Sequence, residues 1–360
     1  MNQPLIPVAL STYTDTVVIG AGQAGLAAAY YLQQHKVDFR LLDAAPAAGA
    51  AWAARYDSLR LFSPAWASGL PGQPWPGPQL RYPTRDETTA YLRGYAAHFG
   101  FPLEPNQRAT RLAAAPTGAG YVVHTAAGHC YTARRVVVAT GPYTAPKIPA
   151  WAAQLPSRVL QLHSRDYQRP TQLPGTGPVA VVGSGNSALQ VAADLAATGR
   201  PVFVAFDEKT PAMPNNQLMW VALVLTGLLR ISRHTWLGRT MFGQPEPVVS
   251  GDLARLRRFA NATFIGRGVA GLPTGALQGA RATSLPLEAV VWATGYGPDY
   301  GWIDLPILEA DGQPRHHRGI TAAPGVAFLG LDWLDSRSSA LLNGTGPDAQ
   351  RVVNELLKMP

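Results

Sequence analysis

Two glycine-rich turns are the segments of this sequence whose residue types and spacing predict chemistry. The first reads GAGQAG from Gly20 to Gly25, and the second reads GSGNSA from Gly183 to Ala188. In such a turn one glycine makes the bend, a second lets the backbone approach a pyrophosphate, and a third lets the next helix pack closely on a strand. The phosphates meet the helix N-terminus, whose free N–H groups and dipole favour negative charge. Two turns of this kind predict two bound dinucleotides.

Strands and helices must present these turns at the edge of a sheet. Apolar residues 16–19 precede the first turn and an Ala- and Leu-rich stretch to Gln34 follows it, which is typical of strand, turn and helix. A second apolar run ends at Asp43, about 20 residues after the first glycine, where a carboxylate accepts hydrogen bonds from a ribose. Residues 179–182 precede the second turn, and a helix-like stretch to Thr198 follows it. The spacing therefore indicates two nucleotide-binding units.

The second unit differs from the first in two places that bear on its ligand. Ala188 replaces the third glycine, and Asp207, Glu208 and Lys209 follow the second strand of the unit. A ligand with a 2′-phosphate needs a cation at that place. Lys209 is the nearest cation and Arg200 is a second candidate, whereas the two carboxylates count against a phosphate. We expect NADPH as the ligand, with NADH as the alternative.

Two further apolar strands each end in an Ala-Thr-Gly turn. These segments are residues 136–141 and 290–295, and each lies downstream of a glycine-rich unit. Small residues let the chain leave a sheet close to a bound cofactor. We therefore expect both turns to border a cofactor.

The composition indicates a globular chain and excludes several classes of protein. The 360 residues are 47% hydrophobic and 14% charged, which is enough apolar material for the cores of two or three domains. The only cysteine, Cys130, excludes a disulfide scaffold and the dithiol chemistry of disulfide reductases. The sequence has no Gly-x-Ser-x-Gly, His-Glu-x-x-His or Cys/His ligand set. We therefore expect no catalytic triad and no metal.

The formal charge of +8 raises the possibility that the protein binds nucleic acid or an anionic membrane surface. Residues 166–284 contain 11 basic and 6 acidic residues, which favours a phosphorylated ligand there, with an Arg-rich surface as the alternative. The longest nearly uninterrupted apolar run, residues 218–229, is shorter than the ~20 residues of a transmembrane helix. Because the first residues lack the basic and apolar parts of a secretory signal, we expect a cytoplasmic protein.

Taken together, these features resemble the flavin-containing monooxygenase superfamily over nearly the whole chain, from Asp15 to Glu355. The resemblance also rests on residues 49–52, 56–61, 82–87 and 162–167. Residues 58–64 are similar to a short bacterial branch that includes monooxygenases encoded with arsenic-resistance genes. The resemblance implies an α/β fold with two Rossmann-like dinucleotide-binding domains.

The implied FAD-binding domain is discontinuous, with residues 10–165 and 285–360. The NAD(P)H-binding domain, residues 166–284, is inserted into it and has a helical insertion at about residues 215–243. This insertion is rich in Leu, Met and Trp, and basic residues follow its apolar half. Four interpretations of it stay open: a packed helical insertion, a lid over the substrate channel, a dimer surface, and a helix at a membrane surface.

The resemblance implies cofactor-binding residues in both domains. The first turn and Asp43 hold the pyrophosphate and ribose of FAD, the second turn holds the nicotinamide cofactor, and residues 342–346 approach the isoalloxazine. The expected cofactor-binding residues are Gly20, Gly22, Gln23, Ala24, Gly25, Asp43, Trp52, Ala139, Thr140, Gly141, Gly183, Gly185, Asn186, Ser187, Lys209, Thr294, Gly295, Gly330, Gly344 and Gly346.

The resemblance implies no obligatory catalytic side chain, because the flavin carries the reaction. The candidates are Trp52, which could also be a core aromatic, Phe62, and His163, which could be a hinge, a cofactor contact or a structural histidine. Ser157 and Val159 stand where the family has Phe and Gly before its histidine, and Phe62 stands where many members have an Asn. These departures keep more than one function open.

The expected function is that of an FAD-dependent, NADPH-consuming monooxygenase, which uses a C4a-hydroperoxyflavin to oxygenate a small nucleophilic heteroatom substrate. The alternatives are an NAD(P)H oxidase or reductase without oxygen transfer, and a non-catalytic flavin-based redox sensor. The expected partners are the small-molecule substrate and O₂, with no nucleic acid and no transmembrane segment. Contact with a membrane surface and a homodimer both stay open.

Overall fold

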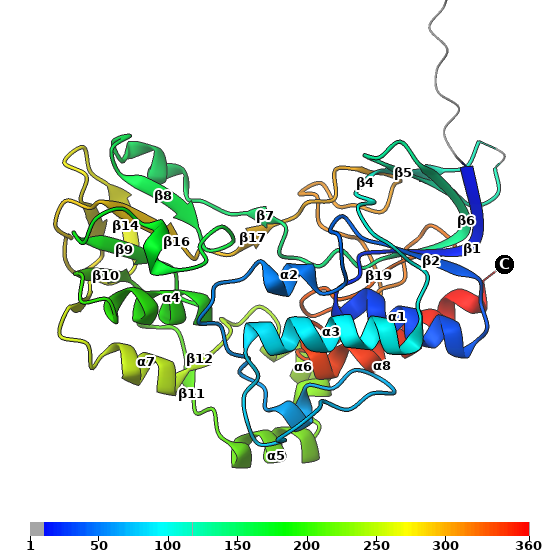
Figure 1. The fold of residues 1–360 in the computed structure, drawn as a ribbon, viewed down its shortest axis with the longest axis horizontal. Coiled ribbons are helices and arrows are strands. Elements are labelled where there is room, and N and C mark those ends of the chain that lie inside the picture. The colour runs from blue at the N-terminus through cyan, green and yellow to red at the C-terminus, as the bar shows by residue number, and fades with distance from the viewer. Residues whose placement is uncertain (1–10, 117, 360) are drawn as a thin grey trace, which may run out of the picture.

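The computed structural model describes residues 11–116 and 118–359. Its chain forms two α/β units, each built around its own sheet (Figure 1). This confirms the expected fold class of two Rossmann-like units.

The first unit has an eight-stranded sheet in the order β18-β4-β5-β6-β1-β2-β3, with β19 also paired to β6. The strands β19, β6, β1, β2 and β3 run parallel, whereas β4, β5 and β6 form an antiparallel extension. The bounds are β1 (Ser11–Ile19), β2 (Phe39–Leu42), β3 (Leu103–Glu104), β4 (Ala109–Ala114), β5 (Tyr121–Thr125), β6 (Cys130–Val138), β18 (Ile303–Asp304) and β19 (Val326–Phe328).

Helices cover the parallel part of the first sheet. Helix α1 (Gln23–Gln34) packs against α3 (Arg85–Phe99) and α8 (Leu342–Leu357). The central strands β1 and β6 are fully buried at Val17, Val18, Val136 and Val137, as expected where both faces of a parallel sheet are covered. Short helical turns α2 (Ala50–Ala53) and η1 (Ala65–Ala67) lie between β2 and α3.

The second unit has a five-stranded parallel sheet in the order β13-β10-β9-β16-β8. Alternate residues of its strands face two separate cores: Val179 and Val181 face α4, whereas Ala180 and Val182 face the other side. The bounds are β8 (Leu160–His163), β9 (Val179–Val182), β10 (Val202–Ala205), β13 (Ala262–Phe264), β16 (Ala289–Trp292), α4 (Asn186–Ala196), α7 (Ser250–Leu256), β14 (Gly268–Gly271), β15 (Leu277–Gly279), η2 (Ala150–Gln154) and η3 (Pro170–Gln172).

The chain passes between the units at β7 (Ala145–Pro146) and β17 (Tyr296–Gly297), which pair with each other in antiparallel fashion. We call these two crossings, together with the contacts that residues 55–57 make to Tyr296 and Arg169, the joint. The hydrogen bonds of β8 and β16 place both strands in the second sheet, outside the expected limits of 166–284. Both are four-residue apolar strands whose pairing is non-local, so their sequence alone does not identify their sheet. The two sheets thus divide close to β7 and β17, rather than at residues 165 and 285.

The segment between β11 (Ala212–Met213) and β12 (Val248–Val249) leaves the second unit and packs on the first. It contains α5 (Gln217–Leu225), η4 (Leu228–Arg230) and α6 (Trp236–Met241). The Ser338 N–H donates to Leu229 O at 2.9 Å, which fastens the segment to the first unit. No helix within the described residues is long and apolar enough to cross a bilayer.

Candidate dinucleotide sites and the joint between them

The first glycine turn lies at the carboxyl end of β1, beside the carboxyl end of β6. A Cβ on Gly20 would lie 2.5 Å from Ala139 O, and a Cβ on Gly25 would lie 1.7 Å from Gly20 O. Gly20 also has φ +108°, which side chains disfavour. A Cβ on Gly22, by contrast, would meet nothing within 4 Å. Two glycines are therefore required by the chain itself, whereas the third faces open space into which a ligand fits.

The start of α1 has no side-chain cap on its N-terminal residue Gly22. The side chain of Gln23 donates from Nε2 to Ala340 O at 2.7 Å, so it ties α1 to the C-terminal segment instead of capping the helix. Gly330 approaches the same turn so closely that a Cβ there would lie 2.6 Å from the Cβ of Ala24. The first N–H groups of α1 thus remain available to an anion.

Asp43 follows β2 and braces the first turn. Its Oδ2 accepts the Ala21 N–H at 2.6 Å, and its Oδ1 accepts the Ala45 N–H at 2.8 Å. Each carboxylate oxygen can accept a further hydrogen bond. The predicted ribose contact is therefore compatible with the bonds that Asp43 already makes.

The start of α8 closes the first site from another side. A Cβ on Gly344 would lie 1.8 Å from Ser338 O, and one on Gly346 would lie 2.8 Å from Pro71 Cγ. Directly before Gly344, the buried Oδ1 of Asn343 has no hydrogen-bond partner among the described residues. A buried acceptor without a partner is costly, and it fits an N–H donor of a bound ring.

The second glycine turn repeats this geometry at the carboxyl ends of β9 and β16. A Cβ on Gly183 would lie 2.1 Å from Ala293 O, and one on Gly185 would meet nothing within 4 Å. Gly185 begins α4 without a side-chain cap. Asn186 is turned toward β12, because its Oδ1 accepts the Val249 N–H at 2.8 Å, and Ser187 is exposed.

Two cations lie near the residues that follow β10. The side chain of Lys209 is exposed, and its backbone N–H donates to Asp207 Oδ1 at 3.1 Å. Arg281 forms an ion pair with Glu208, a contact that the sequence did not indicate. Arg200 is excluded as a cofactor cation: it is buried before the start of β10 and pairs with Glu288 at 3.0 Å.

The two Ala-Thr-Gly turns have different surroundings. The Ala139 N–H donates to Ile19 O at 2.8 Å, so Ala139, Thr140 and Gly141 follow β6 next to the first glycine turn. In the second, Thr294 donates from Oγ1 to Lys147 O, and Gly295 O accepts the Lys147 N–H at 3.0 Å. The second turn therefore fastens the two chain crossings to each other.

His163 ends β8 beside these crossings. Its Nδ1 accepts the Arg165 N–H at 3.1 Å, so its Nε2 carries the proton and donates to Gly295 O at 3.0 Å. Burial lowers the pKa of this histidine, and its ring packs edge-on against Tyr296. Both ring nitrogens are thus engaged with backbone, which is the arrangement of a residue that positions the joint.

Trp52 and Phe62, the other two catalytic candidates, lie on segments of the first unit. Trp52 is on α2, half-buried against the core of the first unit. Phe62 stacks on Trp220 of α5, with the ring centroids 6.5 Å apart. Phe62 thus contacts the inserted segment.

An arginine with two tyrosines faces the joint and was not found from the sequence. Arg55 donates to Tyr296 OH at 2.7 Å, and its guanidinium lies within 6 Å of the Tyr143 and Tyr296 ring centroids, a cation–π distance. Tyr143 donates to Asp332 Oδ1 at 2.8 Å. Arg55 lies between the family segments 49–52 and 56–61, and no motif singled it out.

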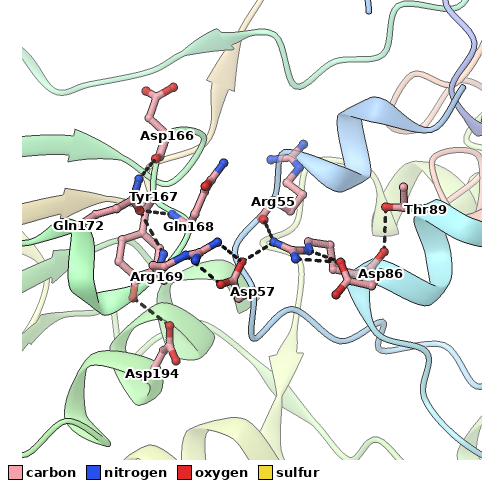
Figure 2. Close-up of polar contacts among 11 residues, drawn as sticks. Arg55, Asp57, Asp86, Thr89, Asp166, Tyr167, Gln168, Arg169, Gln172 and Asp194 are labelled. Atoms are coloured by element: carbon pink, nitrogen blue, oxygen red, sulfur yellow. Dashed lines mark hydrogen bonds and ion pairs between the residues drawn. The ribbon is translucent and has the colours of Figure 1, made fainter. Parts of the chain in front are cut away.

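Asp57 connects the two units through ion pairs (Figure 2). It accepts from Arg85 of α3 at 2.5 Å and from Arg169 of the second unit at 3.0 Å. Its N–H also donates to Gln168 O at 2.8 Å. Asp57 and Arg85 lie in two of the segments that carried the family resemblance, and Arg169 lies two residues after a third. The structure therefore brings these parts of the chain together.

Tyr56 extends the same contact into the core of the second unit. Its hydroxyl donates to Gln190 Oε1 of α4 at 3.0 Å, and burial raises its pKa to about 12. A segment of the first unit therefore packs beside the helix that begins the second site.

Comparison with known proteins places these features in a family. The family described as pyridine nucleotide-disulphide oxidoreductase matches residues 17–226. An uncharacterized oxidoreductase CzcO-like of Geobacillus kaustophilus is 37% identical over 348 residues, which covers 95% of this chain and 98% of that protein. An indole-3-pyruvate monooxygenase of Oryza sativa is 31% identical over 248 residues, 64% of this chain and 60% of its own.

A solved structure extends the similarity to the fold. A flavin-containing monooxygenase from Stenotrophomonas maltophilia superposes with a TM-score of 0.76 at 29% sequence identity. The match covers 96% of this chain and 98% of that one. The match therefore spans both units of the chain.

Proposed function

The chain belongs to the pyridine nucleotide-disulphide oxidoreductase family and to the flavin-containing monooxygenase superfamily. From this membership we propose that it is an FAD-dependent, NADPH-consuming monooxygenase. The observation that carries the proposal is the pair of uncapped helix starts at Gly22 and Gly185, two glycines whose own Cβ positions are open. Both fit a pyrophosphate, because free N–H groups and the helix dipole favour its charge.

FAD is assigned to the first turn and NADPH to the second. Asp43 is positioned to accept a ribose hydroxyl of FAD, and Asn343 Oδ1 is positioned to accept an N–H from the ring. Lys209 and Arg281 are the cations for a 2′-phosphate at the end of β10. The proposal puts the meeting point of the two cofactor rings near Arg55, whose guanidinium lies over the rings of Tyr143 and Tyr296.

When bound, FAD would supply the redox chemistry, that is, hydride acceptance from NADPH and activation of O₂. No protein thiol takes part, because Cys130 begins β6 whereas the cofactor turn follows the end of that strand, about 26 Å away at 3.3 Å per residue. The family name refers to disulphide chemistry, which needs two thiols, and the chain has one cysteine. What the chain supplies is binding, orientation and exclusion of water.

Rapid mixing of the NADPH-reduced holoprotein with O₂ tests the oxygen-transfer step. We expect an oxygenated flavin that persists before the oxidised spectrum returns. Immediate release of hydrogen peroxide would identify an oxidase instead, and failure of NADPH to bleach the flavin would identify a sensor.

The substrate is proposed to be a small nucleophile oxygenated at a heteroatom. NADPH consumption and product formation are measured across amines, sulfides and trivalent arsenicals, with a ketone as the electrophilic comparison. The proposal expects a nucleophile to yield an oxygenated product in proportion to NADPH. A ketone as the sole productive substrate would contradict it.

A further inference from the structure

The outer face of α5 is apolar and meets nothing else in the described chain. Eight of the nine residues of α5 are apolar. Trp220 points inward and is 3% exposed, in a cluster with Ala67 and Leu229. Leu218, Val221 and Leu225 lie on the opposite side at helical spacing, and Leu218 and Leu225 are 79% and 81% exposed. A helix that is apolar on all sides normally has every side covered.

The exposed apolar surface of the molecule is concentrated in this segment. Of the fifteen large apolar side chains that are exposed in the described residues, eight lie between residues 218 and 242. They are Leu218, Val221, Val224, Leu225, Leu228, Trp236, Leu237 and Phe242. Scattered exposed apolar residues are ordinary, whereas such a concentration marks an interaction site.

The charge of the segment identifies the kind of partner. Residues 209–245 include four Lys or Arg residues and no Asp or Glu. Arg230 and Arg239 are exposed and form no ion pair within residues 11–116 and 118–359. A second copy of the chain would bring the same positive charge to the same face and repel it. Anionic lipid headgroups complement this charge, and their acyl chains complement the leucines.

We propose that α5 and η4 dock the protein on an anionic lipid surface, with Leu218, Val221 and Leu225 among the acyl chains and Arg230 at the headgroups. At nine residues α5 is too short to span the ~30 Å hydrocarbon core, so it lies in the surface plane. Figure 1 draws α5 at the lower edge of the molecule, beyond both sheets. Docking there adds a function to the proposed redox chemistry without using its cofactor residues.

Sedimentation of the holoprotein with lipid vesicles tests the proposal. The wild-type protein is expected to bind vesicles of phosphatidylcholine with phosphatidylglycerol, to bind pure phosphatidylcholine much less, and to be released by salt. The double variant Leu218→Glu/Leu225→Glu is expected to lose binding by at least about tenfold. The matched control is Val269→Glu/Leu285→Glu, which alters two apolar side chains that are 51% and 54% exposed in the second unit.

A second pair of variants separates charge from apolar insertion. Arg230→Gln/Arg239→Gln is expected to reduce binding to the anionic vesicles, whereas Arg258→Gln/Arg267→Gln leaves it unchanged. FAD content and flavin reduction by NADPH should be normal in every variant, so a failure here is distinct from a failure of the proposed function. Absence of wild-type binding to anionic vesicles overturns the proposal. The proposal is also overturned if light scattering shows a dimer of the wild-type protein and Leu218→Glu/Leu225→Glu dissociates it, because a second copy of the chain then covers the face.

Discussion

The two glycine turns share a plan but differ at the third position and in how each turn is braced. In the first, Gly25 lies so close to Gly20 O that no side chain fits, whereas the second has Ala188, fully buried, at the equivalent place. The first turn donates its Ala21 N–H to the Asp43 carboxylate, whereas in the second the Ser184 hydroxyl accepts the Asp207 N–H. The first site is therefore the more tightly built, as suits a resident cofactor, and the second suits one that exchanges.

The largest effect is expected from Gly25→Ala. Its Cβ would meet a backbone carbonyl at 1.7 Å, so the helix must move, at a cost of about 3 kcal/mol, and FAD should be lost. The ratio of flavin to protein absorbance and the melting temperature measure this. The reciprocal change, Ala188→Gly, should cost no more than about 1 kcal/mol and leave FAD bound. Equal damage from both changes would remove the contrast between the sites.

Gly185→Val should block the second site without harming the fold. Its side chain points into open space, so we expect normal FAD content and stability but a rise in the KM for NADPH of at least about tenfold, through loss of contact with the backbone. Steady-state kinetics and calorimetry check the two parts. If NADPH still reduces the flavin at the wild-type rate and affinity, the ligand does not lie on this turn.

Lys209→Ala tests the 2′-phosphate at the second site. Loss of one phosphate contact should raise the KM for NADPH about five- to tenfold, or roughly 1 to 1.4 kcal/mol, with the KM for NADH unchanged. Arg281→Ala should act in the same direction, and Arg267→Ala serves as the control for charge. A change that is equal for both cofactors would contradict the assignment.

Asp57→Asn tests the joint that holds the sites together. Partly exposed ion pairs contribute about 0 to 1 kcal/mol, so the melting temperature should change little. The rate of flavin reduction should fall several-fold, because Arg85 and Arg169 no longer share a carboxylate. Stopped-flow reduction at saturating NADPH measures it, with Asp86→Asn, whose carboxylate pairs only within the first unit, as the control. An unchanged rate would show that the joint does not set how the nicotinamide lies relative to the flavin.

The smallest effect concerns His163 and pH. Because burial lowers its pKa below the ordinary value of 6.5, the unfolded chain binds the proton more readily than the folded one. The stabilising contribution is therefore complete above pH 6.5 and is lost as the pH falls through the folded-state pKa. The variant His163→Gln should have a shallower loss of stability below pH 6.5 in denaturant titrations. A profile identical to that of the wild type would remove His163 from this role.

The two turns could be predicted because their signals are local. Glycine spacing, the preceding apolar strand and Asp43 all lie within about 25 residues of one another. The structure adds why each glycine is needed, since Gly25 is forced by a carbonyl and Gly22 faces open space. Arg200 was the exception, because its position along the chain did not reveal that it is buried and pairs with Glu288.

The joint could not be predicted, since it joins residues far apart in the chain. Nothing local to Asp57 specifies that Arg169 lies beside it, and Arg55 reaches Tyr296 only because β7 and β17 pair. The pairing of β8 with β16, and of β16 with β9, could not be predicted for the same reason, because the paired residues lie far apart in the chain. Likewise, an all-apolar pattern in α5 predicts burial on every side and does not say that Leu218 and Leu225 face outward.

The most direct test of the central claim is anaerobic mixing of the purified yellow holoprotein with NADPH. If the two glycine turns bring a nicotinamide to a flavin, the flavin absorbance should bleach in a single turnover, and Gly185→Val should prevent this at the same NADPH concentration. A colourless protein that takes up no FAD, or a flavin that NADPH leaves oxidised, would contradict the account.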